Sequence, residues 1–208
     1  MKIDETLSTR DKILHTAQHI FIEKGKDGAR MQEIADQAGV NKAMLFYYFN
    51  NKELLYLEVL RSIVGRLFQN VNEVVISEHE PRKKLEQLVE AYINFLIENE
   101  GLPRIMLREI ASGGETIGKI FNETLSQGEN PISMKIHSMI ENSIQQGQFR
   151  QVDPIQTIIS IVGMCVIYFI ANPLLRHIFS LKDIDQKKFI EDRKKHIVDL
   201  LEYGLICS

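Results

Sequence analysis

Hydrophobic side chains recur along this chain at intervals of three and four residues, and no window alternates with the period of two that is typical of strands. This spacing predicts helices that each have one apolar face. Near the N-terminus, Ser8 is a suitable cap for a first helix that Gly25 ends. Gly39 ends a second helix and Asn41 caps a third. The N-terminal helices are predicted over residues 9–24, 31–38, 42–49 and 52–77.

The rest of the chain has the same helical spacing, and its prolines fall between the periodic segments. Further helices are predicted over residues 81–99, 102–111, 115–147 with a break at 128–131, 155–171 and 186–206. We therefore predict an all-α protein of about nine helices. A three-helix N-terminal domain is expected over residues 1–54, and a larger C-terminal helical bundle over residues 55–208.

One predicted helix is unusually apolar. Residues 155–175 contain no charged side chain, and a bilayer span needs about 20 mainly apolar residues. The most apolar part, residues 158–171, is shorter than that, and Asn172-Pro173 interrupts the pattern. The composition favours a core or interface helix, and a membrane span is the alternative.

Composition and charge narrow the class of protein. The 208 residues are 44% hydrophobic and 25% charged, which excludes a disordered tail, a collagen-like chain and a disulfide scaffold. Lys and Arg number 25 against 28 Asp and Glu, so the bulk charge of −3 indicates no polyanionic partner. The two cysteines, Cys165 and Cys207, are too few for a disulfide framework, and residues 1–12 lack an apolar signal-peptide core. We expect a cytoplasmic protein.

Residues 30–52 have the spacing of a helix-turn-helix unit. Ala35 supplies the small residue where two helices touch, and Gly39 tolerates the positive φ of a tight turn. Leu45 and Phe49 supply the apolar side chains by which the second helix faces back into the unit. This pattern predicts a pair of helices that can present one helix to DNA.

The charge around this unit agrees with DNA binding. Two lysines and no acidic residue lie between Gln37 and Lys52, although residues 1–54 contain eight basic and eight acidic side chains. DNA affinity would therefore come from the placement of the cations and not from net charge. Lys42 opens the second helix, whose N-terminal residues contact base edges in this docking geometry.

The segments LSTRDKILHTAQHIFIEKG and EIADQAGVNKAMLFYYFNNKELL together resemble the N-terminal DNA-binding domain of the TetR family of transcriptional regulators. The similarity covers about residues 9–55. It implies a homodimer that binds double-stranded DNA at a palindromic operator, usually as a repressor. It also implies release by a small-molecule effector bound in the C-terminal bundle.

The resemblance assigns DNA contacts to seven positions, which are Arg30, Lys42, Ala43, Met44, Tyr47, Tyr48 and Lys52. Arg30 stands where the family usually has Thr or Ser, so it can reach a phosphate but cannot cap the first helix of the unit. Phe46 stands where Tyr is usual, which removes one hydroxyl contact. Alternatively, Tyr47 and Tyr48 pack within the domain, and Lys52 is a solvated surface residue.

A ligand pocket is expected among aromatic and Met side chains of the bundle, because Met adapts to irregular apolar sites. The candidate ligand-binding residues are Phe68, Phe95, Met106, Phe121, Met134, His137, Met164 and Tyr168. They favour a hydrophobic or amphipathic ligand, and ordinary core packing is the alternative. The helices at 155–171 and 186–206 exceed what one bundle needs to bury, so we expect them to form a two-fold dimer interface, as in the family.

Other chemistry is not indicated. The sequence has no phosphate loop, nucleophile elbow or suitable carboxylate pair, so we expect neither an enzyme nor a cofactor. His15 and His19 have the spacing of metal ligands, but no third ligand lies nearby, so no metal site is expected. The alternatives to a ligand-released repressor are a ligand-independent DNA-binding protein, an all-α small-molecule carrier and a membrane-anchored form. The sequence leaves the sign of regulation open.

Overall fold

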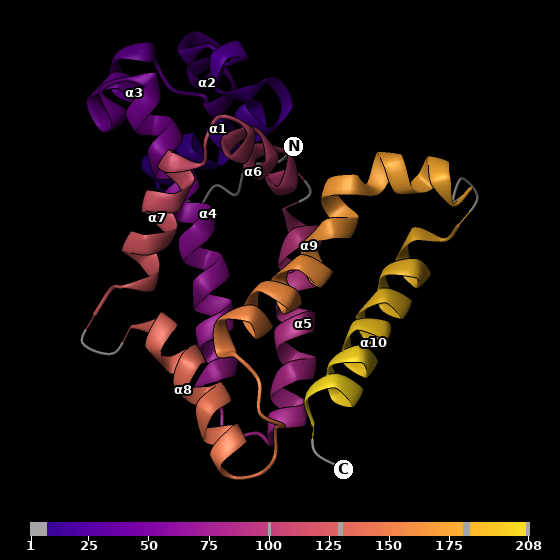
Figure 1. Ribbon diagram of the computed structural model, residues 1–208. Coiled ribbons are helices and arrows are strands. Elements are labelled where there is room, and N and C mark those ends of the chain that lie inside the picture. The colour runs from indigo at the N-terminus through magenta and orange to yellow at the C-terminus, as the bar shows by residue number, and fades with distance from the viewer. Residues whose placement is uncertain (1–7, 100, 129–130, 181–183, 207–208) are drawn as a thin grey trace. The chain divides into compact units, whose positions relative to one another are not determined.

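The computed structural model describes residues 8–99, 101–128, 131–180 and 184–206, and these residues form ten helices (Figure 1). The helices are α1 Thr9–Gly28, α2 Met31–Ala38, α3 Lys42–Phe49, α4 Lys52–Val75, α5 Pro81–Glu98, α6 Leu102–Ala111, α7 Glu115–Leu125, α8 Ile132–Gln145, α9 Pro154–Ile178 and α10 Gln186–Leu205. Within the described ranges, extended backbone pairs only in an isolated bridge between Phe149 and Ile206. The all-α prediction is confirmed.

The tenth helix arises because the segment predicted as one broken helix over residues 115–147 forms two separate helices, α7 and α8. Gly128 has a φ of +82°, which a helix does not accommodate, and Pro131 precedes the first residue of α8. A break is present between Leu125 and Ile132, residues 129–130 of the predicted break lie outside the described residues, and the predicted count of about nine becomes ten in the part of the chain that the structure describes.

The chain forms two compact units. The head unit comprises residues 1–65 and 104–121, and the bundle unit comprises residues 66–103 and 122–208. This structural division differs from the functional division predicted between residues 54 and 55. It includes the first half of α4 in the head unit, where Leu55 and Val59 are buried, together with most of α6 and α7. The functional division stays a prediction.

The head unit is built on the apolar face of α1. Ile13, Ala17 and Phe21 are completely buried at intervals of one helical turn, and α1 packs against α2. Ser8 caps α1 as predicted, because its hydroxyl oxygen accepts the backbone N–H of Asp11 at 3.2 Å.

Gly25 interrupts α1 near its end. Its φ of +73° and ψ of 171° lie outside the helical region. Helical backbone resumes after Gly25 and ends at Gly28. The predicted stop at Gly25 is thus a kink inside the longer segment Thr9–Gly28. This conformation suits glycine because other residues pay a steric penalty at positive φ.

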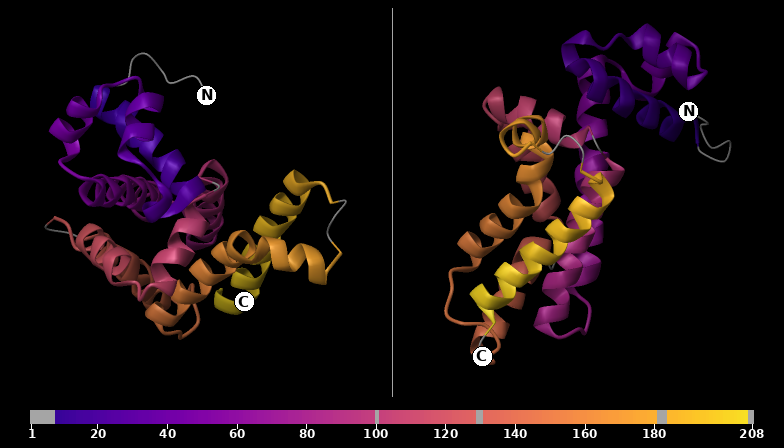
Figure 2. Two further views of the ribbon diagram at one scale, coloured as in Figure 1. Left: turned by 90° about the horizontal axis from the view of Figure 1, so that it is seen from above. Right: turned by 90° about the vertical axis from the view of Figure 1, so that its right-hand side faces the viewer.

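The bundle unit has a core of its own, in which α5 packs against α9 and α10, and α8 packs against α9. Figure 2 shows α9 and α10 side by side in both views. The buried side chains that form this core are Leu85, Val89, Ile93, Ile140, Phe149, Cys165, Tyr168, Ile190, Ile197, Leu201 and Leu205. They recur at helical spacing on α5 and α10, so these two helices bury one face each.

Helix α9 is longer than predicted. The expected end at Asn172-Pro173 is wrong, because α9 continues through Pro173 to Ile178. Figure 1 shows that α9 changes direction toward its C-terminal end, as expected where proline removes one helical hydrogen bond and its ring displaces the preceding turn.

By length and composition alone, α9 could cross a membrane, since its most apolar stretch has a mean hydropathy of 2.2. Only 11% of that stretch is buried within the chain. Cys165 and Tyr168 belong to the bundle core, but most of this apolar stretch is not enclosed by the described residues. The interface role and the membrane span both require a surface beyond this chain.

Candidate nucleic-acid interface

The turn between α2 and α3 has the geometry that the sequence predicts. Gly39 ends α2 in the left-handed conformation, with φ of 68° and ψ of 30°. The backbone N–H of Val40 donates to the carbonyl of Ala35 at 3.0 Å, which closes the turn. Ala35 is completely buried where the helices meet. Beyond residue 39 and its two chain neighbours, no atom lies within 4 Å of where a Cβ would stand, so glycine is required for its backbone conformation and not for lack of space.

Helix α3 begins at a side-chain cap and is held by two residues. The Oδ1 atom of Asn41 accepts the backbone N–H of Met44 at 2.7 Å. Leu45 and Phe49 are buried, whereas the other six residues of α3 are exposed. The helix is therefore anchored along one narrow stripe and presents most of its surface outward.

The two tyrosines of α3 differ in environment. Tyr47 is 82% exposed and Tyr48 is 41% exposed, and their rings lie 5.4 Å apart in an edge-to-face arrangement. The Tyr48 ring also lies 6.3 Å from that of Phe49. Tyr48 thus combines packing with exposure, while the ring and hydroxyl of Tyr47 face outward. Their assignment as DNA contacts stays a prediction.

The cations of the head unit fall into two groups. Arg10 pairs with Glu58 at 2.5 Å, and Lys24 and Lys26 pair with Glu33 and Glu53. In contrast, no carboxylate among the described residues pairs with the cations in the 30–52 segment, which are Arg30, Lys42 and Lys52. The head unit thus neutralises Arg10, Lys24 and Lys26, whereas the cations within the helix-turn-helix segment are left available for phosphates.

Arg30 and Lys52 flank the turn between α1 and α2. Arg30 is the N-cap residue of α2 and makes no side-chain capping bond there, as the sequence predicts. The Lys52 ammonium donates to the carbonyls of Asp27 and Ala29, each at 3.3 Å. These bonds use two of its three donors, so the structure adds a positioning role to the predicted phosphate contact.

One polar contact of the head unit has no counterpart in the sequence analysis. The hydroxyl of Tyr56 on α4 donates to Oε1 of Glu109 on α6 at 2.7 Å. Burial and the neighbouring Glu109 carboxylate raise the pKa of Tyr56 above its ordinary value of 10.0, so its hydroxyl remains a donor into the alkaline range. The two residues lie 53 positions apart, and no local pattern connects them.

The candidate ligand residues do not form one cluster within a single unit. Met106 and Phe121 belong to the head unit, and the other six belong to the bundle unit. In the bundle unit Tyr168 is a core residue against which Met164 packs, and His137 lies 3.3 Å from Glu141. Phe68 is half-buried and Met134 is exposed. Phe95 is buried and borders a groove between α4 and α5 whose other lining residues are mostly polar.

Two further groups with potential reactivity are the His15–His19 pair and the Cys165 thiol. The rings of His15 and His19 lie 4.8 Å apart, and in the described ranges no three His, Cys, Asp or Glu side chains are grouped so as to hold a metal ion. Cys165 is a buried free thiol, and burial raises its pKa to about 12. A thiol in this state is a packing residue and not a nucleophile.

Comparison with known proteins agrees with this arrangement. Residues 13–59 match the bacterial regulatory proteins of the tetR family, and residues 81–201 match the tetracyclin repressor-like C-terminal domain. The solved structure of the ketosteroid transcriptional regulator KstR2 of Mycobacterium tuberculosis superposes with a TM-score of 0.68 over 98% of each chain at 18% identity. That similarity shows the shared fold.

Two relatives with curated functions regulate in opposite directions, one as a repressor and the other as an activator. The transcriptional repressor NicS of Pseudomonas putida is 27% identical over 198 residues, which are 95% of this chain and 92% of NicS. The transcriptional activator FasR of Mycolicibacterium smegmatis is 37% identical over 87 residues, which are 42% of this chain and 40% of FasR. The matching families and relatives are regulators and not enzymes, and the chain belongs to the TetR family of DNA-binding transcriptional regulators.

Proposed function

We propose that this chain is a cytoplasmic, homodimeric repressor that binds a palindromic operator through α3. The observation that carries this proposal is the surface of α3, where only Leu45 and Phe49 are buried and Lys42 and Tyr47 face outward. An exposed helix that begins with an unpaired lysine fits the major groove, where N-terminal residues of a recognition helix contact base edges. Unpaired Arg30 and the third donor of Lys52 would contact phosphates beside it.

The second part of the proposal is the dimer. Seven large apolar or aromatic side chains are exposed on two adjacent helices of the bundle unit, namely Ile155, Ile159, Ile167, Leu174 and Ile178 on α9 and Leu200 and Tyr203 on α10. On α9 they recur at four, eight, seven and four positions, which places them on one side of the helix. An apolar patch of this extent is typical of an interface, and a second copy of α9 and α10 would cover it as a four-helix contact.

An effector would act through a difference in affinity between two states of the protein. We infer that the apolar positions in the bundle, including buried Phe95 and Tyr168, take a hydrophobic or amphipathic molecule. Two recognition helices of a dimer must meet successive major grooves about 34–36 Å apart. A ligand that binds better when the heads are spaced differently weakens operator binding by the same free energy.

The test is selection of bound fragments from the source genome by the full-length protein, followed by affinity measurements for wild type and Tyr47→Ala. A recovered palindrome, steep salt dependence and a large loss in Tyr47→Ala are the expected results. Leu107→Ala is the matched control, because Leu107 is also an exposed side chain of the head unit but lies on α6 and not on α3. Random fragments, or equal binding by Tyr47→Ala, would contradict the proposal.

A further inference from the structure

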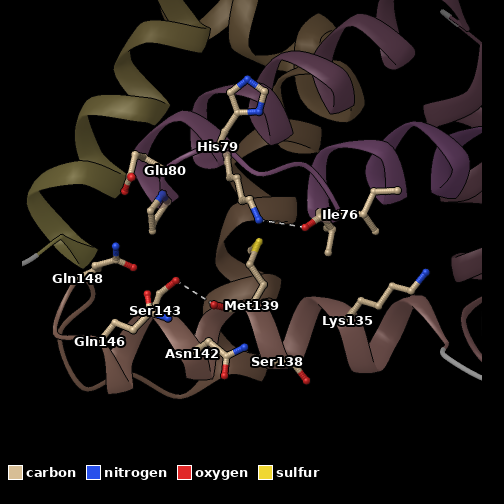
Figure 3. Close-up of a pocket in the computed structure, with 13 residues that line it drawn as sticks. Ile76, His79, Glu80, Lys135, Ser138, Met139, Asn142, Ser143, Gln146 and Gln148 are labelled. Atoms are coloured by element: carbon tan, nitrogen blue, oxygen red, sulfur yellow. Dashed lines mark hydrogen bonds between the residues drawn. The ribbon is translucent and has the colours of Figure 1, made fainter.

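A groove of about 510 Å³ lies in the bundle unit, where the end of α4 and the start of α5 face α8 (Figure 3). None of the eight ligand positions predicted from the sequence lines it. Its wall carries Lys84 from α5 and Lys135 from α8, with the side-chain amides of Asn142, Gln146 and Gln148. The groove therefore brings two cations and several hydrogen-bond donors to one concave surface.

Both lysines are half-buried and have only neutral partners. The Lys84 ammonium donates to the carbonyl of Val75 at 3.1 Å, and the Lys135 ammonium donates to Oδ1 of Asn72 at 3.0 Å. Neither makes an ion pair within the part of the chain that the structure describes. Each ammonium has three donors, so each keeps two for a further acceptor.

In the first turn of α5, the cation that lines the groove differs from its two neighbours, which are paired. Arg82 pairs with Glu202 at 2.5 Å and Lys83 pairs with Glu86 at 2.6 Å, whereas Lys84, which faces the groove, pairs with no carboxylate in the described ranges. The turn contains no acidic residue, and the N-terminal end of a helix is itself partly positive. A bound anion would offset this concentration of positive charge.

The other residues that line the groove offer hydrogen-bond donors and apolar surface. Asn142, Gln146 and Gln148 make no side-chain hydrogen bond within the described residues, so their amides are free to donate. Ile76 and Met139 add apolar surface to the groove, and Figure 3 shows the Met139 side chain directed into it. Glu80 is the acidic residue of the lining, so the two lysines outnumber it.

We propose that this groove binds a small organic oxyanion, either a carboxylate or a phosphate monoester, that carries a short apolar chain. Lys84 and Lys135 hold the oxyanion, the amides donate to its remaining oxygens, and the chain contacts Ile76 and Met139. The inference concerns binding in the bundle unit and does not depend on operator binding.

The experiment titrates the full-length protein calorimetrically with hexanoate, hexyl phosphate and hexanol at constant ionic strength. Both anions are expected to bind, and hexanol, which has the same chain without the charge, is expected to bind at least about tenfold more weakly. The tighter of the two anions identifies the natural head group. Equal binding of hexanol, or no binding of either anion, overturns the proposal.

Lysine variants place the site. Lys84→Gln and Lys135→Gln are each expected to weaken anion binding about tenfold, because each removes a charge-assisted hydrogen bond. Lys83→Gln is the matched control, since Lys83 lies in the same turn but is paired with Glu86 and does not line the groove. Equal losses in all three variants overturn the assignment, as does no loss in either groove variant.

Two further measurements keep this result separate from the proposed function. Thermal melting of each variant shows that it is folded, and Lys135→Gln tests the site if Lys84→Gln loses its bond to Val75 and unfolds. Affinity for a selected operator fragment is measured in parallel. Operator binding without anion binding overturns this inference and leaves the proposed function intact, and anion binding without operator binding does the reverse.

Discussion

The hydroxyl of Tyr56 donates a 2.7 Å hydrogen bond to the carboxylate of Glu109, and this bond joins α4 to α6 within the head unit. The Tyr56 ring also lies 5.0 Å from Phe21 of α1, edge to face. The side chain of Tyr56 therefore connects three helices of the unit that carries α3. Through this residue, the position of α6 is coupled to the packing of the DNA-binding helices.

Tyr56→Phe is expected to lower the free energy of unfolding by about 1.5–3 kcal/mol, because it removes a half-buried hydrogen bond to a charged group and leaves Glu109 without its donor. Urea denaturation measures the change. Tyr47→Phe removes a hydroxyl from a side chain that is 82% exposed and is expected to leave the free energy of unfolding unchanged. Equal stability of Tyr56→Phe and wild type would show that Glu109 finds water instead.

Gly39→Ala tests the conformational requirement of the turn between α2 and α3. The φ of +68° is expected to make alanine destabilising by about 1–2 kcal/mol, although no atom beyond residue 39 and its two chain neighbours lies within 4 Å of the new methyl group. Gly118→Ala is the control, because Gly118 is helical and has equally open surroundings, and there alanine is expected to stabilise by about 0.5–1 kcal/mol. Thermal melting distinguishes the two signs. A neutral Gly39→Ala would mean that the turn relaxes to another conformation.

The helix-turn-helix could be predicted from sequence because each of its determinants is local. Asn41 caps α3 by accepting the backbone N–H three residues ahead, Gly39 turns the chain between its own neighbours, and Leu45 and Phe49 lie one helical turn apart. Such features depend on the backbone within a few residues and hardly on the rest of the fold. For the same reason the caps of α1 and α3 are where the sequence predicts them.

Long-range pairing could not be predicted in the same way. The Lys52 ammonium finds the carbonyls of Asp27 and Ala29, 25 and 23 positions away, and Lys135 finds Asn72 across 63 positions. A lysine has no sequence signature for its partner, because any nearby oxygen can accept a hydrogen bond from its ammonium. The length of α9 could not be predicted from its own sequence either. Whether a helix ends at a proline or bends and continues, as α9 does at Pro173, depends on packing against other parts of the fold.

Lys42→Gln is expected to weaken operator binding and to reduce the slope of log affinity against log salt concentration by about one for each recognition helix, hence by about two for a dimer. Lys42 is suited to this test because it makes no ion pair within the described ranges, and its Nζ atom lies 5.9 Å from the Phe46 ring centroid. Fluorescence anisotropy over a salt series gives the slope. Lys119→Gln, which removes a lysine paired with Glu115 on α7, should leave the slope unchanged. An unchanged slope in Lys42→Gln would remove Lys42 from the DNA contacts.

Cys165 makes stability sensitive to alkaline pH. Burial raises the pKa of its thiol from an ordinary value of 9.0 to about 12, against the opposing effect of the Arg193 guanidinium. The unfolded chain therefore releases a proton above pH 9 that the folded chain keeps, so this contribution to stability is complete below pH 9 and falls by about 1.4 kcal/mol for each pH unit above it. Urea denaturation from pH 8 to pH 11 should show a steeper decline for wild type than for Cys165→Ala. Parallel curves would mean that the folded thiol is accessible to hydroxide.

Ile159→Glu tests the proposed dimer face. Ile159 lies on the exposed side of α9 and is 59% exposed among the described residues, so a monomer should tolerate glutamate there. In a two-fold interface the substitution places two carboxylates in one apolar contact, and the desolvation of each is expected to cost several kcal/mol. Sedimentation velocity should therefore show a monomer for Ile159→Glu and a dimer for wild type. Ile110→Glu is the matched control, because Ile110 on α6 has nearly the same exposure and lies outside α9 and α10. A dimer that survives Ile159→Glu but not Ile110→Glu would move the interface to the head unit and leave the apolar face of α9 for another partner.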